Sequence, residues 1–240
     1  MSRKFAVFVE GLTEQEFTIR LLTELAVKCG IVLEIQKQYR GTLSFIELRN
    51  LHTSPQHPQP IHVLIANCCN DNQVKQQIKD NYKTLDAQGY SLIVGLYDVY
   101  PLTHSEIQNV LDAQPIGLPN GGIPIQLHLA ILEIEAWFLE EITHFSRIDS
   151  KITAKKLVNN GFDHNKFSAD TLSHPSKTLD DIYKSVGKRY IDNDGRKKGG
   201  RIKRTVDALS LVELFDNTRR KVPSLDKFIT SLETGLFSTT

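Results

Sequence analysis

The beginning of the chain constrains its fold more than any other stretch. Residues 5–9 form an uncharged apolar run, Phe-Ala-Val-Phe-Val, which is typical of a buried strand. Gly11 ends this run, and Thr13 lies three residues before Glu16, which is the spacing of a capping box at a helix start. Apolar residues then recur at helical spacing over 17–25. The chain therefore opens with a strand, a turn and an amphipathic helix.

The same alternation of strands and helices continues as far as about residue 142. Phe45, Leu48 and Leu51 have the spacing of a short helix, and the remaining segments alternate between apolar runs and amphipathic patterns. Such alternation predicts an α/β fold with a mostly parallel sheet and helices on both faces. Further strands are expected at 31–35, 61–66, 90–97 and 125–130, and further helices at 73–87 and 103–112.

Beyond residue 146 the pattern changes, because no further strong strand follows. We therefore expect an α/β domain at 1–145 and a helical C-terminal extension at 146–240, which contains a basic, glycine-bearing loop at 187–204. Helices of this extension are expected at 151–160, 205–215 and 225–232.

Composition excludes several classes of protein. The 29 Lys and Arg nearly balance the 28 Asp and Glu, so bulk charge does not indicate nucleic-acid binding. Cys29, Cys68 and Cys69 include no C-x-x-C pair, which argues against a disulfide framework or a zinc site. No apolar run is long enough to span a membrane and no signal peptide is recognised, so we expect a cytoplasmic protein without a membrane segment. A P-loop and a G-x-S-x-G motif are also missing.

Acidic residues follow three of the predicted strands. Glu10 comes directly after the first strand, Asp98 follows a later apolar strand, and Glu133 and Glu135 come shortly after another. Carboxylates gathered from strand ends suit Mg²⁺ or Mn²⁺, and without a cation their charges would repel one another. If a helix has begun by Glu133, one of the pair Glu133 and Glu135 faces the site, because residues two apart on a helix point about 200° apart.

The segments around these acids resemble a known family. Residues 9–17, Val-Glu-Gly-x-Thr-Glu-x-x-Phe, look like the first motif of the Toprim fold. Residues 133–139, Glu-Ile-Glu-Ala-Trp-Phe-Leu, resemble the Glu-Ala-Trp signature of Toprim-like nucleases related to the OLD nucleases, which accompany ABC-type ATPases in bacterial phage defence. Residues 222–232 are similar to the ending of that subgroup. In the second motif, Asp-x-Asp, the second acid is replaced by Tyr100, and a phenol is a poor Mg²⁺ ligand.

The resemblance implies a Mg²⁺-dependent or Mn²⁺-dependent nuclease in which Glu10, Asp98 and Glu135 are catalytic and, together with Glu133, hold metal. It also implies an ABC-type ATPase partner that restrains the nuclease until phage infection. DNA, RNA including tRNA, a homodimer, and one or two metal ions all stay open. Two other functions also stay open: a Toprim-like binding or regulatory subunit with weakened catalysis, as Tyr100 suggests, and a nucleotidyl-transferring, primase-like enzyme.

The basic loop is the second candidate site. Its cations could neutralise phosphates, and Tyr183 and Tyr190 could stack on bases, although packing in the core is the simpler role for both rings. Trp137 and Phe138 are expected in the core. The candidate nucleic-acid contacts are Lys188, Arg189, Arg196, Lys197, Lys198, Arg201, Lys203 and Arg204.

Overall fold

The structure is a computed structural model that describes residues 3–53, 59–70, 73–99, 104–192 and 195–238. Tyr100, which stands in the second acid position of the Asp-x-Asp motif, lies outside the described residues.

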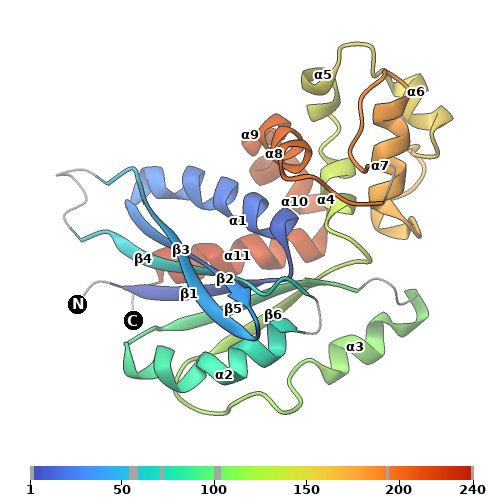
Figure 1. Ribbon diagram of the computed structural model, residues 1–240. Helices are drawn as coiled ribbons and strands as arrows, with labels where there is room; N and C mark the ends of the chain where they lie inside the picture. The colour runs from blue at the N-terminus through green and yellow to red at the C-terminus, as the bar shows by residue number, and fades with distance from the viewer. Residues whose placement is uncertain (1–2, 54–58, 71–72, 100–103, 193–194, 239–240) are drawn as a thin grey trace. The chain divides into compact units, whose positions relative to one another are not determined.

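Six strands form one sheet (Figure 1). They are β1 (Lys4–Val9), β2 (Ile31–Tyr39), β3 (Thr42–Leu51), β4 (Ile61–Asn67), β5 (Leu92–Asp98) and β6 (Ile125–Ala130). Their order in the sheet is β3-β2-β4-β1-β5-β6. The pairs β1–β4, β1–β5 and β2–β4 are parallel, and β2–β3 is antiparallel. The predicted α/β class with a mostly parallel sheet is therefore confirmed.

The chain divides into two compact units, which we call the sheet unit and the helical unit. This division differs from the boundary expected at residue 145. The last helix groups with the sheet, since the guanidinium of Arg3 donates to the carbonyl of Leu236, and the segment that follows β6 groups with the helices. The sheet unit comprises Met1–Tyr97, Leu111–Leu129 and Lys227–Thr240, and the helical unit comprises Asp98–Val110 and Ala130–Asp226.

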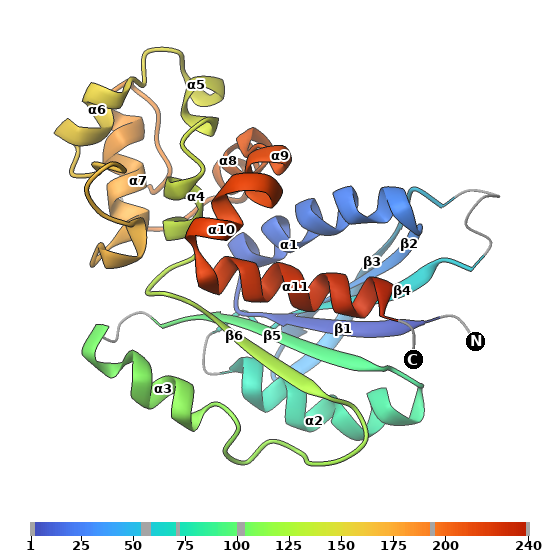
Figure 2. The same ribbon diagram turned by 180° about the vertical axis from the view of Figure 1, so that it is seen from behind.

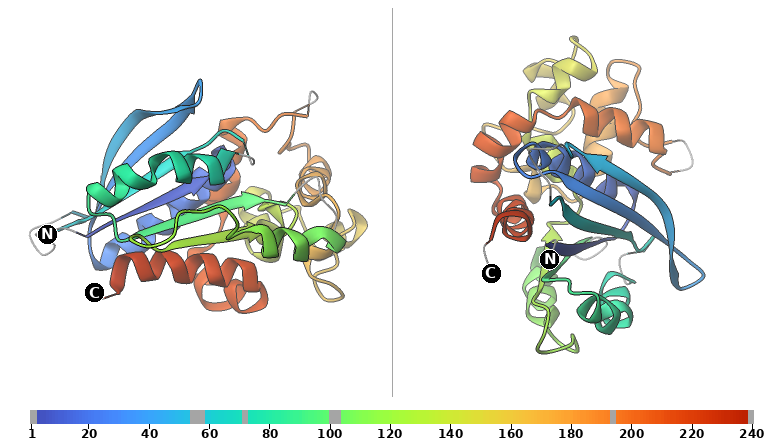
Figure 3. Two further views of the ribbon diagram at one scale, coloured as in Figure 1. Left: turned by 90° about the horizontal axis from the view of Figure 1, so that it is seen from below. Right: turned by 90° about the vertical axis from the view of Figure 1, so that its left-hand side faces the viewer.

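Helices cover both faces of the sheet, as predicted. Ala6 and Phe8 of β1 pack into the apolar cluster that contains the buried side of α2, whereas Phe5 lies against Gly235 of α11. Figure 2 and the left panel of Figure 3 show α11 on one face and α2 on the other. The helices named here, together with α1, have the bounds α1 (Leu12–Leu25), α2 (Gln73–Ala87) and α11 (Pro223–Phe237).

The helical unit has a core of aromatic and aliphatic side chains. Trp137, Phe138, Tyr183 and Tyr190 are fully buried, which confirms the core role of the first two and keeps both tyrosine rings away from solvent. The described helical segments here are α4 (Glu135–Glu140), α5 (His144–Ile148), α6 (Ala154–Asn159), η3 (Ala169–Thr171), α7 (Pro175–Lys184), α8 (Gly199–Ala208), α9 (Leu211–Glu213), the π-helix η4 (Leu214–Thr218) and α10 (Arg219–Lys221). The remaining short helices are η1 (Ala26–Lys28), η2 (His104–Glu106) and α3 (Ile107–Ala113).

The short helix expected around Phe45 and Leu48 is wrong, because these residues belong to β3. Arg40 and Gly41 have positive φ angles of 50° and 86°, which form a two-residue hairpin turn between β2 and β3. A bulge then leaves Ile46 unpaired. The two apolar residues therefore lie on one face of a strand although they are three residues apart.

The capping box expected at the start of the first helix is also wrong. Gly11 is the N-cap of α1 in extended conformation, with no side-chain cap, and Thr13 is buried inside the first turn. The turn after β1 is so short that the helix begins at Leu12.

Within the described residues, every helix is too short or too polar to serve as a membrane-crossing segment. Cys29, Cys68 and Cys69 are free thiols, as expected.

Candidate functional site

A strained turn in the helical unit carries two of the predicted acids. The backbone N–H of Glu133 donates to the carbonyl of Ile131 at 2.9 Å, across Leu132, whose φ is 60°. Such an angle is rare for a bulky residue, and strain of this kind concentrates at functional sites. Helix α4 begins only at Glu135, so Glu133 precedes it. Because Glu133 and Glu135 do not lie on one helix, both carboxylates can face the same site.

Three carboxylates of the helical unit surround one ammonium. The Nζ atom of Lys197 lies 2.7 Å from Oε1 of Glu135, and the charges of Asp98 and Glu133 also act on Lys197. Glu135 is fully buried and Glu133 is 9% exposed, whereas the Lys197 side chain is 27% exposed. The residues 98, 133 and 135, predicted from strand ends, are thus brought together in one unit, and we call them the acid cluster.

Each carboxylate of the acid cluster is held by hydrogen bonds. Glu133 accepts from the backbone N–H and the hydroxyl of Ser176, at 2.8 and 2.7 Å, in the first turn of α7. Asp98 accepts from the backbone N–H of Ile134 at 3.0 Å, and Glu135 accepts from the hydroxyl of Tyr190 at 2.5 Å. These donors fix the carboxylates before any ligand arrives, which is the arrangement that a binding or catalytic site requires.

Burial and mutual repulsion change the ionisation of this cluster. Burial, and then the charge of Glu135, raise the pKa of Glu133, against Lys197 and the two donors of Ser176. Burial alone would lower the pKa of Lys197, but the carboxylates of Glu135, Asp98 and Glu133 raise it above its ordinary value. The ammonium is therefore charged, and it partly offsets the negative charge around it.

One carboxylate oxygen of the cluster stays without a donor. Oε1 of Glu135 accepts from both Tyr190 and Lys197, whereas Oε2 is buried and has no hydrogen-bond partner among the described residues. An unpaired buried carboxylate oxygen costs free energy, so this atom is suited to a cation. In the part of the chain that the structure describes, no three Asp, Glu, His or Cys side chains take up the arrangement of a metal-ligand set.

Glu10 occupies the predicted position at the end of a central strand, but in the sheet unit. It follows Val9, and its backbone N–H donates to the carbonyl of Leu96 on β5 at 3.2 Å. The pKa of the Cys68 thiol is raised to about 12, chiefly by burial and further by the charges of Cys69 and Glu10. The charge of Glu10 therefore acts on Cys68, which directly follows β4. That Glu10 and Asp98 of the helical unit bind one ion stays a prediction.

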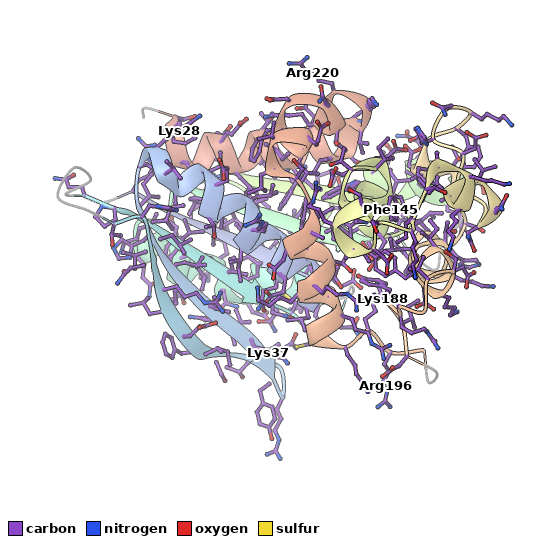
Figure 4. The ribbon with its side chains drawn as sticks, turned by 90° about the horizontal axis from the view of Figure 1, so that it is seen from above. Lys28, Lys37, Phe145, Lys188, Arg196 and Arg220 are labelled. Atoms are coloured by element: carbon purple, nitrogen blue, oxygen red, sulfur yellow. The ribbon has the colours of Figure 1, made fainter. Side chains whose placement is uncertain are left out.

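The basic segment is largely paired within the helical unit. Lys197 binds Glu135, Lys198 and Arg201 bind Asp192, Lys203 binds Asp207, Arg189 binds Asp180, and Arg204 donates to the carbonyl of Arg189. The expectation of a loop over 187–204 is wrong for its last part, because α8 begins at Gly199 and buries Ile202 and Thr205 at helical spacing. Arg196 is exposed, and Figure 4 shows its side chain extending away from the ribbon.

Two residues that hold the acid cluster were not identified from the sequence as its partners. Tyr190 was considered for base stacking, yet its hydroxyl positions Glu135. Ser176 follows Pro175 at the first turn of α7, and a proline at a helix start is the signal that could have marked donors suited to an acid.

A second buried charged network has a structural role. Glu141 accepts from the backbone N–H groups of Thr143 and Ser210, at 3.0 and 2.9 Å, and from Arg147 at 3.0 Å. His144 is fully buried, and burial lowers its pKa to about 4. Because Glu141 binds backbone groups on two segments, it ties the turn before α5 to the start of α9.

Comparison with known proteins gives no relative: no family model matches the chain, and neither a curated protein nor a solved structure is significantly similar to it.

Proposed function

We propose that this protein is a nucleic-acid phosphodiesterase that depends on Mg²⁺ or Mn²⁺. The observation that carries the proposal is the acid cluster, in which the carboxylates of Asp98, Glu133 and Glu135 exceed the charge of Lys197 and Oε2 of Glu135 is buried without a donor. Carboxylate oxygens are the ligands that hard divalent cations prefer, so the chemistry of this donor set fits Mg²⁺.

In this proposal Asp98, Glu133 and Glu135 hold the ion, and Glu10 is a fourth ligand predicted from the sequence. A bound ion of this type activates water and stabilises charge on a phosphate. The protein's own contribution is positioning: Ser176, the N–H of Ile134 and Tyr190 hold the three carboxylates in place. Burial keeps water away from the carboxylate of Glu135.

Glu135→Gln tests the proposal, because it keeps the shape of the side chain and removes its charge. We expect cleavage of labelled DNA or RNA in the presence of Mn²⁺ to fall by about a hundredfold or more. Glu24→Gln, an exposed position on α1, is the matched control and should cleave like the wild type. Unchanged cleavage by Glu135→Gln contradicts the assignment.

Glu10→Ala tests the link to the sheet unit separately. If Glu10 binds the same ion, this variant also loses cleavage. Undiminished cleavage would show that Glu10 is not a ligand, and the assignment of the acid cluster would stand.

A second candidate function, a binding or regulatory subunit with weakened catalysis, is favoured by the fact that Lys197 and Tyr190 both occupy Oε1 of Glu135. Titration with Mn²⁺ separates the two candidates. A catalytic site binds Mn²⁺ and loses it in Glu135→Gln, whereas a metal-independent subunit binds nucleic acid equally well in EDTA.

From the resemblance to the Toprim-like defence nucleases, we also propose an ABC-type ATPase as the protein partner. Co-purification with an ATPase of this class, and lower cleavage by the complex than by the isolated chain, would support this regulation. Equal cleavage in both states would refute it.

A further inference from the structure

Lys197 reaches the acid cluster from a segment that is anchored elsewhere. The segment runs from Lys188 to Lys198, and its first part is held by Asp180, which accepts from the backbone N–H groups of Tyr190 and Ile191 at 2.7 and 2.9 Å. Ile191 and Lys197 form an antiparallel bridge within the segment. The backbone at residues 190 and 191 therefore keeps its contacts to α7 whether or not Lys197 binds Glu135.

The bonds at Glu135 differ in how easily they can be given up. Tyr190 is fully buried and its hydroxyl is fixed by the ring, whereas Lys197 is a long, partly exposed side chain whose ammonium can move on four rotatable bonds. A lysine ammonium is strongly hydrated, so release into water is favourable once another cation neutralises the carboxylates. The Lys197–Glu135 pair is thus the exchangeable contact of the cluster.

An ammonium and a divalent cation compete for the same carboxylate. A metal ion on the unpaired Oε2 of Glu135 shares that carboxylate with the ammonium, which lies 2.7 Å from Oε1, and like charges this close repel strongly in a partly buried site. We propose that Lys197 is the resident counter-ion of the acid cluster and must leave Glu135 before a divalent cation binds there. The inference rests on the proposed function, because it describes how the metal site of that function is regulated.

The first test uses the wild-type protein, with Mn²⁺ alone as the probe. Acetylation of lysine amines is quantified by mass spectrometry with and without Mn²⁺, while free Mn²⁺ is followed by electron paramagnetic resonance. We expect the reactivity of Lys197 to rise about tenfold on Mn²⁺ binding, which lies within the usual range of coupling between two binding events. Lys198, which binds Asp192, is the internal control and keeps its reactivity. Bound Mn²⁺ with unchanged reactivity of Lys197 overturns the inference.

The second test uses Lys197→Gln, with Lys198→Gln as the matched control. Because the competing charge is removed, we expect Lys197→Gln to bind Mn²⁺ about tenfold more tightly than the wild type, and Lys198→Gln to bind it equally. Mn²⁺ should also raise the unfolding temperature of Lys197→Gln more than that of the wild type. Equal or weaker Mn²⁺ binding by Lys197→Gln contradicts the inference, and the footprinting of the wild type still decides it if this variant does not fold.

A parallel cleavage assay distinguishes failure of the inference from failure of the proposed function. If cleavage depends on Mn²⁺ and on Glu135 but the reactivity of Lys197 does not respond to Mn²⁺, the proposed function is supported and the displacement of Lys197 is contradicted. If Mn²⁺ releases Lys197 but no nucleic acid is cleaved, the displacement of Lys197 is supported and the proposed function is contradicted. If neither the wild type nor Lys197→Gln binds Mn²⁺, both proposals are overturned.

Discussion

The two units bury different kinds of side chain. Among the described residues, the interior of the sheet unit is mainly apolar, its other buried polar side chains are uncharged, and Glu14 is its one buried carboxylate. In the described part of the helical unit, four carboxylates and a histidine are buried. They are Glu133, Glu135, Glu141, Asp180 and His144.

A chemical site can form where buried charges are held in fixed positions. An apolar layer is stabilised in proportion to the apolar surface area that it buries. A buried carboxylate instead needs hydrogen-bond donors or cations beside it, and these partners fix its position. Glu141 and Asp180 are matched by backbone N–H groups and tie segments together. The acid cluster combines excess negative charge with an unpaired oxygen on Glu135.

The strongest test of the apolar interior is Phe8→Ala. Phe8 is fully buried between β1 and α2, so the substitution removes apolar contacts and leaves a cavity. We expect the free energy of unfolding to fall by about 3–5 kcal/mol, measured by urea denaturation, and equally at pH 5 and pH 8. Phe237→Ala, at an exposed position of α11, is the control and should change stability by less than about 1 kcal/mol. A loss below about 1 kcal/mol for Phe8→Ala would show that the layer is not tightly packed.

A test of the charged interior is the pH dependence that His144 contributes. Its pKa is about 4 in the folded state, because it is buried, against an unfolded value of 6.5. The unfolded state therefore binds the proton first as the pH falls, and stability is lost between pH 6.5 and 4. We expect the stability difference between the wild type and His144→Asn to change by about 3 kcal/mol between pH 7 and pH 4.

Urea unfolding at both pH values measures this change. Glu141 and Arg147, which lie beside His144, are present in both proteins, so the difference between them reports mainly on the imidazole. His128 of the sheet unit also has a pKa of about 4, caused by burial and then by Lys227, and His128→Asn should show the same direction of change. Because the pKa shift is the same, its effect should be of similar size. Parallel pH curves for the wild type and His144→Asn would contradict the prediction.

The sequence predicted what local patterns determine. The strand at 5–9 and the alternation after it follow from the apolar character of short runs, and they were confirmed. The strand around Phe45 was missed because a bulge imitates helical spacing. The grouping of the last helix with the sheet depends on contacts such as Arg3 to Leu236, which join the ends of the chain and leave no local pattern.

For the candidate site, the acids were identifiable because charged residues after apolar runs are conspicuous. Their partners were not. Lys197 is one of several cations in a basic segment, and only the folded helical unit shows that it binds Glu135. Ser176 and Tyr190 are common residues whose role depends on which carboxylate they meet.

Tyr190→Phe tests how firmly the acid cluster is held. It removes the buried hydroxyl that donates to Glu135 at 2.5 Å and leaves the ring in place. Because hydrogen bonds to charged groups are stronger than neutral ones, we expect the free energy of unfolding to fall by about 2 kcal/mol. Tyr39→Phe, at an exposed position on β2, should leave stability unchanged. Thermal and urea unfolding measure both variants, and equal stabilities would mean that the hydroxyl does not hold Glu135.

The smallest expected effects come from two helical glycines, one in each unit, and they have opposite signs. A Cβ atom on Gly235 of α11 would lie 2.8 Å from the ring of Phe5, so Gly235→Ala should lower the free energy of unfolding by about 1 kcal/mol. A Cβ atom on Gly200 of α8 meets nothing within 4 Å, so Gly200→Ala should raise it by up to about 1 kcal/mol through helix propensity. The same substitution thus measures how closely α11 packs against the sheet and how much space surrounds the first turn of α8. Stabilisation by both substitutions would show that Phe5 can move aside, and the sheet unit would then be less rigid than its burial indicates.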